Sequence, residues 1–460
     1  VWIMAYTTID DPTIYFNTKL YAGNGSTNAI SGVGFQSDFV WLKDRTAANS
    51  HKQYDGVRGA TKYLISDATS AEATQSNGLT SFDSDGFTLG SYSGTNNSSN
   101  NYVSWNWLAG GTAPAITYTV KVVSDSGNKY RFDDFGTSAV TLDLQEGGTY
   151  TFDQSDSSNS GHPLRFSTTS NGTHGGGSEY TTNVTTNGTP GSSGAYTRIT
   201  VAASAPTLYY YCTQHSGMGG QANTNSTFGS SNFSGSIQST VSAGSTQGFS
   251  IVKWTGTGSA GTIGHGLGSA PLIVLFKRRS DASNWYFYTY QIDGSSDELG
   301  LNYTEGKTDR SLTAPTSSVF YVDDQFERNS SSADQLAYVF AEKKGYSKFS
   351  TYVGNGSSDG TYIHLGFKPA WILLKQSSAN GAGWRIHDNK RGISGNPEDE
   401  TLYASASNAE STGRDVDFLS NGFKLRTDSG DGNTSGSTYI YMAFAESPFV
   451  NSNGIPTNAR

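Results

Sequence analysis

The sequence predicts an all-β protein built from several tandem β-sandwich domains. Aromatic residues make up 13% of the chain, glycine occurs 55 times, and only 15% of the residues are charged. Aromatic residues and threonine favour strands, whereas glycine, asparagine, aspartate and serine favour turns. Because 460 residues exceed one ordinary domain, three or four domains are expected.

One sequence pattern occurs three times, which predicts three related units. Each copy has a glycine, a short turn and an apolar strand that ends in lysine, at residues 34–43, 268–277 and 366–375. The apolar strand of each copy is expected to be a buried central strand. The aromatic strands that close the copies, expected to pair with the central strands, are 105–109, 337–341 and 441–445.

Each copy is expected to fold as a sandwich of about 100 residues, because strands and turn signals alternate along it. Opening strands are predicted at 15–21, 249–254 and 349–353, and turn landmarks at 82–87, 322–326 and 418–423. The segment 223–248 is rich in Ser, Gly, Asn and Thr, which predicts an extended or flexible linker. The expected units are residues 1–111, 116–222, 223–248 (the linker), 249–345 and 346–460.

The three copies resemble a repeat module of structural proteins from marine tailed phages, often tail-fibre or virion-surface proteins. The strand 366–375, the hairpins at 85–87 and 421–423, and the closing run 443–449 carry the resemblance. It covers residues 5–111 and 246–460, and the second copy departs most. The resemblance implies a non-enzymatic fibre, spike or capsid-decorating protein on the virion surface, made in the host cytoplasm, that serves display and host attachment. It also implies other virion proteins and a host-surface glycan as candidate partners. Gly-rich repeat units joined by short linkers suit a homo-oligomer, with a trimer as one option.

Residues 116–222 differ from the repeats and resemble a cupredoxin, a Greek-key β-sandwich. The resemblance rests on Glu146-Gly147-x-Thr-Tyr-Thr-Phe, on His162-Pro-Leu-Arg-Phe, and on Tyr-Tyr-Tyr-Cys212-x-x-His215-x-x-Met218. One thiolate, two imidazoles and a thioether are the ligand set of a blue-copper site.

In copper-binding members, His162, Cys212 and His215 would surround the metal and Met218 would make a weak axial contact. The alternative is a metal-free sandwich in which Cys212 is a small buried residue and Met218 fills the core. No cofactor besides copper is expected.

Aromatic side chains on two strands are candidate contacts for a glycan. Residues 285–290 place aromatics on both faces of a strand, and Trp384 holds a parallel position in the third copy. Rings of this kind stack on sugars, so Trp285, Tyr288 and Trp384 are the candidates. The alternative is that they belong to a core or to a contact between subunits.

The overall charge and the remaining motifs exclude several function classes. A net charge of −9 opposes binding to nucleic acid or anionic lipid. The single cysteine excludes an intrachain disulfide and favours a reducing cytoplasm. No signal-peptide pattern is visible, which counts against the third hypothesis, a bacterial extracellular adhesin or filament. Because no paired carboxylates lie on a defined scaffold, we do not expect an enzyme.

Overall fold

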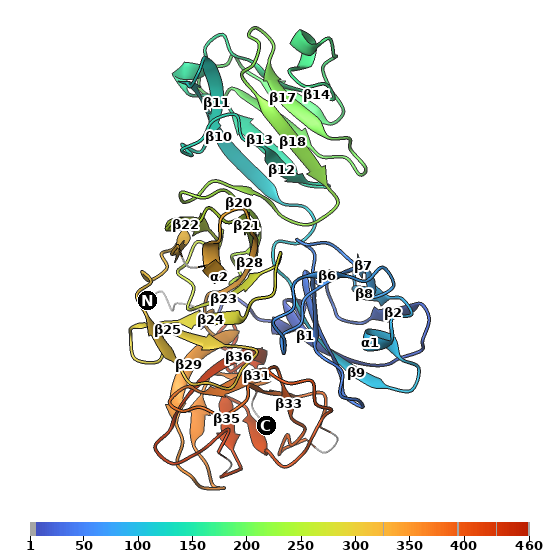
Figure 1. Cartoon of the computed structure of the whole chain (residues 1–460), viewed down its shortest axis with the longest axis vertical. Coiled ribbons are helices and arrows are strands. Elements are labelled where there is room, and N and C mark those ends of the chain that lie inside the picture. Colours follow the sequence, from blue (N-terminus) through green and yellow to red (C-terminus); the bar gives the residue numbers. More distant parts are fainter. Residues whose placement is uncertain (1–5, 325, 393–394, 429, 459–460) are drawn as a thin grey trace.

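The computed structural model describes residues 6–324, 326–392, 395–428 and 430–458 (Figure 1). Strands hold 43% of the chain and helices 4%. The strands form several separate, mostly antiparallel sheets, which confirms the predicted all-β class with multiple sandwiches. The short helices are η1 (Pro12–Ile14), α1 (Ser93–Asn96), η2 (Ser157–Asn159), η3 (Gly172–Gly175) and α2 (Phe326–Asn329).

The first and third repeats share one architecture of two facing sheets. In the first repeat the strands are β1 (Phe16–Ala22), β9 (Asn101–Trp107), β3 (Phe39–Asp44) and β4 (Lys52–Asp55), facing β2 (Asn28–Ser31), β8 (Gly86–Leu89) and β7 (Leu79–Asp83), with a side pair β5 (Lys62–Tyr63) and β6 (Ala73–Thr74). In the third they are β29 (Ser347–Val353), β36 (Thr438–Pro448), β31 (Phe367–Gln376), β32 (Arg385–Asp388) and β33 (Leu402–Tyr403), facing β30 (Tyr362–His364), β35 (Gly422–Leu425) and β34 (Val416–Leu419).

The second repeat has the same central strands within a wider sheet of eight strands. In spatial order these are β19 (Ser230–Asn232), β20 (Ser239–Gly244), β21 (Phe249–Thr255), β28 (Asp334–Phe340), β23 (Ile273–Arg278), β24 (Trp285–Thr289), β25 (Ser296–Gly300) and β26 (Thr308–Arg310). The facing pair is β22 (Gly261–Gly264) and β27 (Val319–Val322).

The predicted central strands β3, β23 and β31 are buried and pair with the predicted closing strands β9, β28 and β36. The register repeats as well, since the pairs Phe39–Trp107, Ile273–Phe340 and Trp371–Phe444 lie directly opposite each other. Residues that share this register are pseudo-equivalent, which relates any position of one repeat to a position of the other two.

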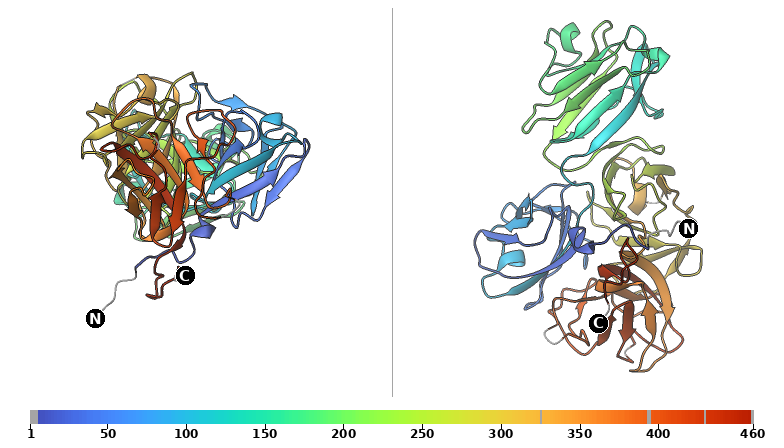
Figure 2. Two further views of the ribbon diagram at one scale, coloured as in Figure 1. Left: turned by 90° about the horizontal axis from the view of Figure 1, so that it is seen from below. Right: turned by 180° about the vertical axis from the view of Figure 1, so that it is seen from behind.

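The three repeats enclose one hydrophobic core, to which each contributes a sheet face. Seen from below, they surround a common centre (Figure 2, left). Aromatic pairs join every two repeats across this centre. Their ring centroids are 4.3 Å apart for Phe39 and Tyr338, 5.6 Å for Trp107 and Trp371, and 6.0 Å for Phe340 and Phe444. The chain therefore folds as an intramolecular trimer of repeats.

The lysine one residue before the end of each central strand is buried and reaches into the neighbouring repeat. Lys43 Nζ donates to the carbonyl of Ser407 (3.1 Å), Lys277 Nζ to Thr69 (3.0 Å), and Lys375 Nζ to Thr304 (2.8 Å). Each bond links one repeat to the next in the same rotational sense. Burial lowers the pKa of these lysines to about 8, 7 and 8 respectively.

The inserted domain is a separate sandwich with its own core and stands at one end of the molecule, beyond the repeats (Figure 1). One sheet contains β11 (Asn128–Phe132), β10 (Ala115–Ser124), β13 (Thr149–Asp153), β16 (Tyr196–Thr200) and β15 (Val184–Asn187). The other contains β12 (Leu142–Gln145), β18 (Gly220–Asn225), β17 (Leu208–Cys212) and β14 (Leu164–Ser167).

The segment 223–248 is not the flexible linker that its composition predicts. Its first residues complete β18, and β19 and β20 join the sheet of the second repeat. Two phenylalanines explain the order. Phe228 packs against Phe82 of the first repeat, and its amide donates to the Gly56 carbonyl (2.8 Å). Phe233 lies in the core of the inserted domain.

The turn landmark predicted at 322–326 is also misplaced. Phe320 pairs with Ile263 just as Phe87 pairs with Ile30 and Phe423 with Ile363, so Phe320 is the true counterpart. The second repeat lacks the Asp-Gly or Asn-Gly turn at this point and enters α2 after β27. Gln325, part of the predicted landmark, lies outside the described residues.

Candidate metal centre

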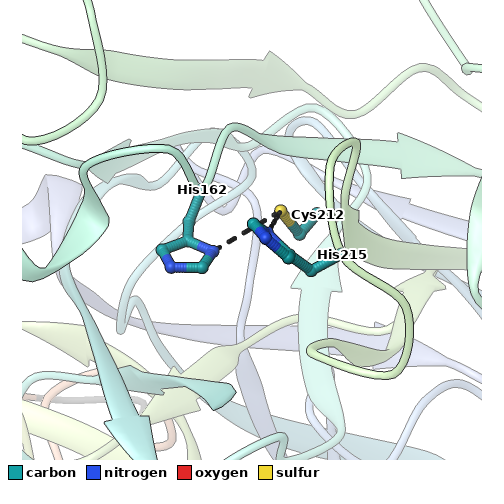
Figure 3. Close-up of side chains that lie close together, drawn as sticks. All are labelled: His162, Cys212 and His215. Carbon is teal, nitrogen blue, oxygen red and sulfur yellow. Dashed lines mark hydrogen bonds between the residues drawn. The ribbon is translucent and has the colours of Figure 1, made fainter.

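Two adjacent strands of the inserted domain bring together residues that are far apart in sequence. Cys212 is the last residue of β17 and lies directly opposite Leu164, which begins β14. His162 precedes β14 by two residues, and His215 lies in the turn between β17 and β18. The antiparallel pairing therefore places both imidazoles beside the thiol (Figure 3).

The ligand atoms of these three residues are close enough to hold one ion. The Nδ1 atoms of His162 and His215 lie 3.9 and 3.7 Å from Cys212 Sγ, and all three ligand atoms lie within 4.8 Å of one another. A metal with bonds of about 2.3 Å to sulfur and about 2.0 Å to nitrogen bridges such atoms up to roughly 4.3 Å apart. The observed sulfur–nitrogen distances satisfy this limit.

Burial and charge prepare the site for a metal. Cys212 is fully buried, His162 is half-buried and His215 is exposed. Desolvation, together with the neighbouring His215 ring, lowers the pKa of His162 below its ordinary value. The neutral imidazole, which is the metal-binding form, is therefore favoured at His162.

Side chains around the site hold the histidine loop in place. The Tyr130 hydroxyl and Gln154 Nε2 both donate to the His162 carbonyl, at 2.9 and 2.8 Å. The Tyr130 amide also donates to the Met218 carbonyl (3.0 Å). Tyr130 thus connects the two loops that carry His162 and Met218.

The cysteine end of β17 is fixed by two further contacts. The Thr213 amide donates to the Pro163 carbonyl (3.1 Å), and His174 Nε2 lies 3.0 Å from the Cys212 carbonyl. The sequence motif predicted the ligands but none of these supporting residues. His174 and Gln154 lie outside the motif, and neither has a sequence signal that would link it to the site.

Met218, the predicted axial ligand, is buried in the core cluster that also includes Cys212 and Tyr130. A buried thioether in this position suits either a weak metal contact or a core filler. The donor set as a whole, with a thiolate, two imidazoles and a thioether, fits copper or zinc by its chemistry.

The sequence of this chain matches the profile of one protein family. The profile of the family described as domain of unknown function DUF7483 matches residues 11–142 and 158–448, which is most of the chain. The chain belongs to this family. The match includes all three repeats and most of the inserted domain. No match was found among curated proteins or among solved structures.

The glycan contacts predicted for this DUF7483 chain are wrong, because the side chains are buried. Trp285, Tyr288 and Trp384 are 0%, 4% and 1% exposed. Trp285 Nε1 donates to the Ile65 carbonyl and Trp384 Nε1 to the Gly300 carbonyl, each 2.7 Å away in another repeat. The side chains belong to the core, as the alternative interpretation held, and the two tryptophans also join repeats of the chain to each other.

No helix in the described parts of this DUF7483 protein combines the length and the apolar character that a membrane crossing requires.

Proposed function

We propose that the inserted domain binds one copper ion through His162, Cys212 and His215, with Met218 as a weak fourth ligand. The observation that carries this proposal is the convergence of two Nδ1 atoms on one buried Sγ, at 3.9 and 3.7 Å. Copper in such a set supplies one-electron redox chemistry. A sandwich core has no packing need for two histidines beside its cysteine.

The residues around the proposed copper site have different roles in binding the metal. Buried Cys212 is shielded from solvent, and Tyr130 and Gln154 hold the His162 loop at a fixed distance from it. His215 is exposed and leaves one edge of the site open to solvent.

A copper titration of the whole chain tests this proposal. We expect one copper per chain and a blue absorption band, both lost in Cys212→Ser. His364→Gln serves as a matched control, because His364 is an exposed histidine on β30 of the third repeat. Absence of colour and of stoichiometric copper in the unmodified chain would leave the domain as a structural sandwich.

For the whole chain we propose a non-enzymatic role on the surface of a tailed-phage virion, as a fibre, spike or capsid-decorating protein. Two features support it besides the sequence resemblance. The repeats use their aromatic residues for a shared core, and the inserted domain projects from that base at one end (Figure 1). Such a base suits display of a domain and attachment to a host surface.

The test is the location of the chain in an infected culture. Mass spectrometry and immunogold labelling of purified particles should find it on the virion, and its absence there would refute the proposal in favour of a bacterial adhesin or filament. Binding to host polysaccharide on a glycan array would then indicate attachment. Firm association with capsids without glycan binding would indicate decoration.

A further inference from the structure

One position near the contacts between repeats carries a positive charge in the first repeat and a negative charge in the other two. It lies two residues before a leucine that is buried in the shared core and pairs at the same register in all three. The leucine pairs are Gln53–Leu64, Phe287–Leu299 and Ile386–Leu402. The pseudo-equivalent residues are therefore Lys62, Asp297 and Glu400.

A second position faces the first across the repeat edge. At this position the backbone amide donates to a carbonyl of the neighbouring repeat, and the accepting residue holds the equivalent position in all three repeats. Glu72 donates to Arg279 (2.9 Å), Lys307 to Ser377 (2.8 Å) and Glu410 to Arg45 (3.0 Å). Glu72, Lys307 and Glu410 are thus pseudo-equivalent.

The two positions form an ion pair in the first two repeats and a like-charge pair in the third. Lys62 lies 4.0 Å from Glu72, and Lys307 lies 2.8 Å from Asp297 with the charges exchanged. In the third repeat both residues are acidic. Burial and then the adjacent Asp399 carboxyl raise the pKa of Glu400, and the Glu410 charge adds to this effect.

The arginines nearby are already engaged by other carboxylates. Arg45 makes a bidentate contact with Glu410, and Arg391 pairs with Asp388 (2.6 Å) and Glu410 (2.9 Å). These two arginines and two carboxylates balance each other. They leave Glu400 without an ion pair in the described part of the chain.

A second carboxylate, the buried Glu398, adds to the negative charge around the half-buried Glu400. Glu398 is 6% exposed, and its Oε2 is buried without a hydrogen-bond partner among the described residues, as is Oε2 of Glu400. Both oxygens lie close to Gly392, which has no side chain. A Cβ added to Gly392 would lie 2.1 Å from Glu398 Oε2 and 3.4 Å from Glu400 Oε2. Burial, with the nearby Asp388 and Glu400 charges, raises the pKa of Glu398 to about 7.

We propose that a hard divalent cation of the Ca²⁺ class binds at Glu398 and Glu400, beside the Gly392 backbone. Arg391 is the cation nearest to Glu398, but it is bonded to Asp388 and Glu410. A buried carboxylate without a bonded partner is unfavourable, and a bound cation would supply the charge that Lys62 and Lys307 supply in the other repeats. The available donors are oxygens, which Ca²⁺ and Mg²⁺ prefer. The site is independent of the thiolate and imidazole centre in the inserted domain.

Binding of the cation is coupled to the contact between the first and third repeats. Glu410, which faces Glu400, holds Arg45 of the first repeat by a bidentate bond. Neutralising Glu400 and Glu398 relieves the repulsion on Glu410 and stabilises this contact.

The test is a calorimetric titration with CaCl₂ after treatment with EDTA. It uses the full chain with Cys212→Ser, so that the copper ligands do not contribute. We expect one Ca²⁺ per chain, with affinity at least tenfold weaker or lost in Glu398→Gln and in Glu400→Lys. Asp309→Asn is the matched control and should bind as the parent does, because its carboxylate belongs to the acidic group that Lys307 already neutralises.

Thermal unfolding gives a second readout. Ca²⁺ should raise the Tm of the parent but not of Glu400→Lys, which copies the Lys62 arrangement and should be at least as stable as the calcium-free parent. Equal binding by parent and both variants would overturn the proposal. The proposal would also be overturned if neither Ca²⁺ nor Mg²⁺ produced heat or a Tm shift while the Tm rose as the pH fell below 7. That result would mean that the two carboxyl groups share a proton and bind no cation.

Discussion

Replacing Trp107 by alanine tests whether the three repeats depend on one shared core. The Trp107 side chain is 2% exposed, and its ring contacts Phe16 and Phe39 of the first repeat and Trp371 and Phe444 of the third. Its Nε1 has no hydrogen-bond partner among the described residues, so the loss is one of packing. A truncation of this kind costs about 3–5 kcal/mol.

Because all three repeats share this core, we expect the substitution to lower the stability of every repeat. Hydrogen exchange measured by mass spectrometry should become roughly 10²–10⁴-fold faster in the most protected amides, since each 1.36 kcal/mol changes the rate tenfold. The acceleration should include β23 and β31 as well as β3. Strands β13 and β17 of the inserted domain have a separate core and serve as the internal control.

Faster exchange confined to the first repeat would refute this reasoning. It would mean that the repeats are independently stable sandwiches that touch without supporting each other. Acceleration in β13 and β17 would equally contradict the separation of the two cores.

Two further predictions concern charge and the metal centre. The pKa values of Lys43, Lys277 and Lys375 (about 8, 7 and 8) lie below the unfolded value of ~10.4, so the unfolded chain binds more protons. The free energy of unfolding of the repeats should therefore rise between about pH 8 and 10 in urea titrations, and a fall would contradict the buried positions. Tyr130→Phe removes the hydrogen bond to the His162 carbonyl. This substitution should weaken copper binding about tenfold while the blue band remains. An unchanged affinity for copper would exclude a positioning role for Tyr130.

The sequence predicted the central strands because their pattern is local. An apolar run that ends in lysine reads as a buried strand in each copy, and β3, β23 and β31 are buried strands. The partner of that lysine could not be predicted. It is a carbonyl more than 70 residues away in another repeat, as for Lys375 and Thr304, and single-sequence patterns report burial but not which distant element causes it.

The errors have the same physical origin. Aromatics on both faces of β24 suggested exposure, whereas both faces of this strand are covered, one by the shared core and one by the second repeat's own core. The Ser- and Gly-rich composition of 223–248 suggested flexibility, yet Phe228 and Phe233 each pack into a different hydrophobic core. A few large side chains outweigh a polar background, because burial of each one stabilises the segment around it.

The candidate metal site was predictable to the extent that its ligands follow a short motif. Cys212, His215 and Met218 lie within seven residues on one strand end and turn, so their proximity follows from sequence. His162 required the pairing of β14 with β17, which the cupredoxin resemblance implied. The acidic pair at Glu398 and Glu400 had no such pattern. It becomes visible only when the structure aligns the three repeats and reveals that one of three equivalent charge pairs is unbalanced.

The intramolecular trimer changes the argument for a homo-oligomer. From the sequence, Gly-rich repeats joined by short linkers suggested a homo-oligomer, with a trimer as one option. In the folded chain each repeat presents an aromatic sheet face, and the three faces cover one another. Few large apolar side chains remain exposed in the described residues, namely Ile14, Val353, Tyr362 and Ile455. Burial of the repeats therefore requires no second chain. If light scattering finds a stable oligomer, we expect its contacts to come from polar surfaces or from the inserted domain. Trp107→Ala should then lower the stability of each chain without changing the number of subunits in the oligomer.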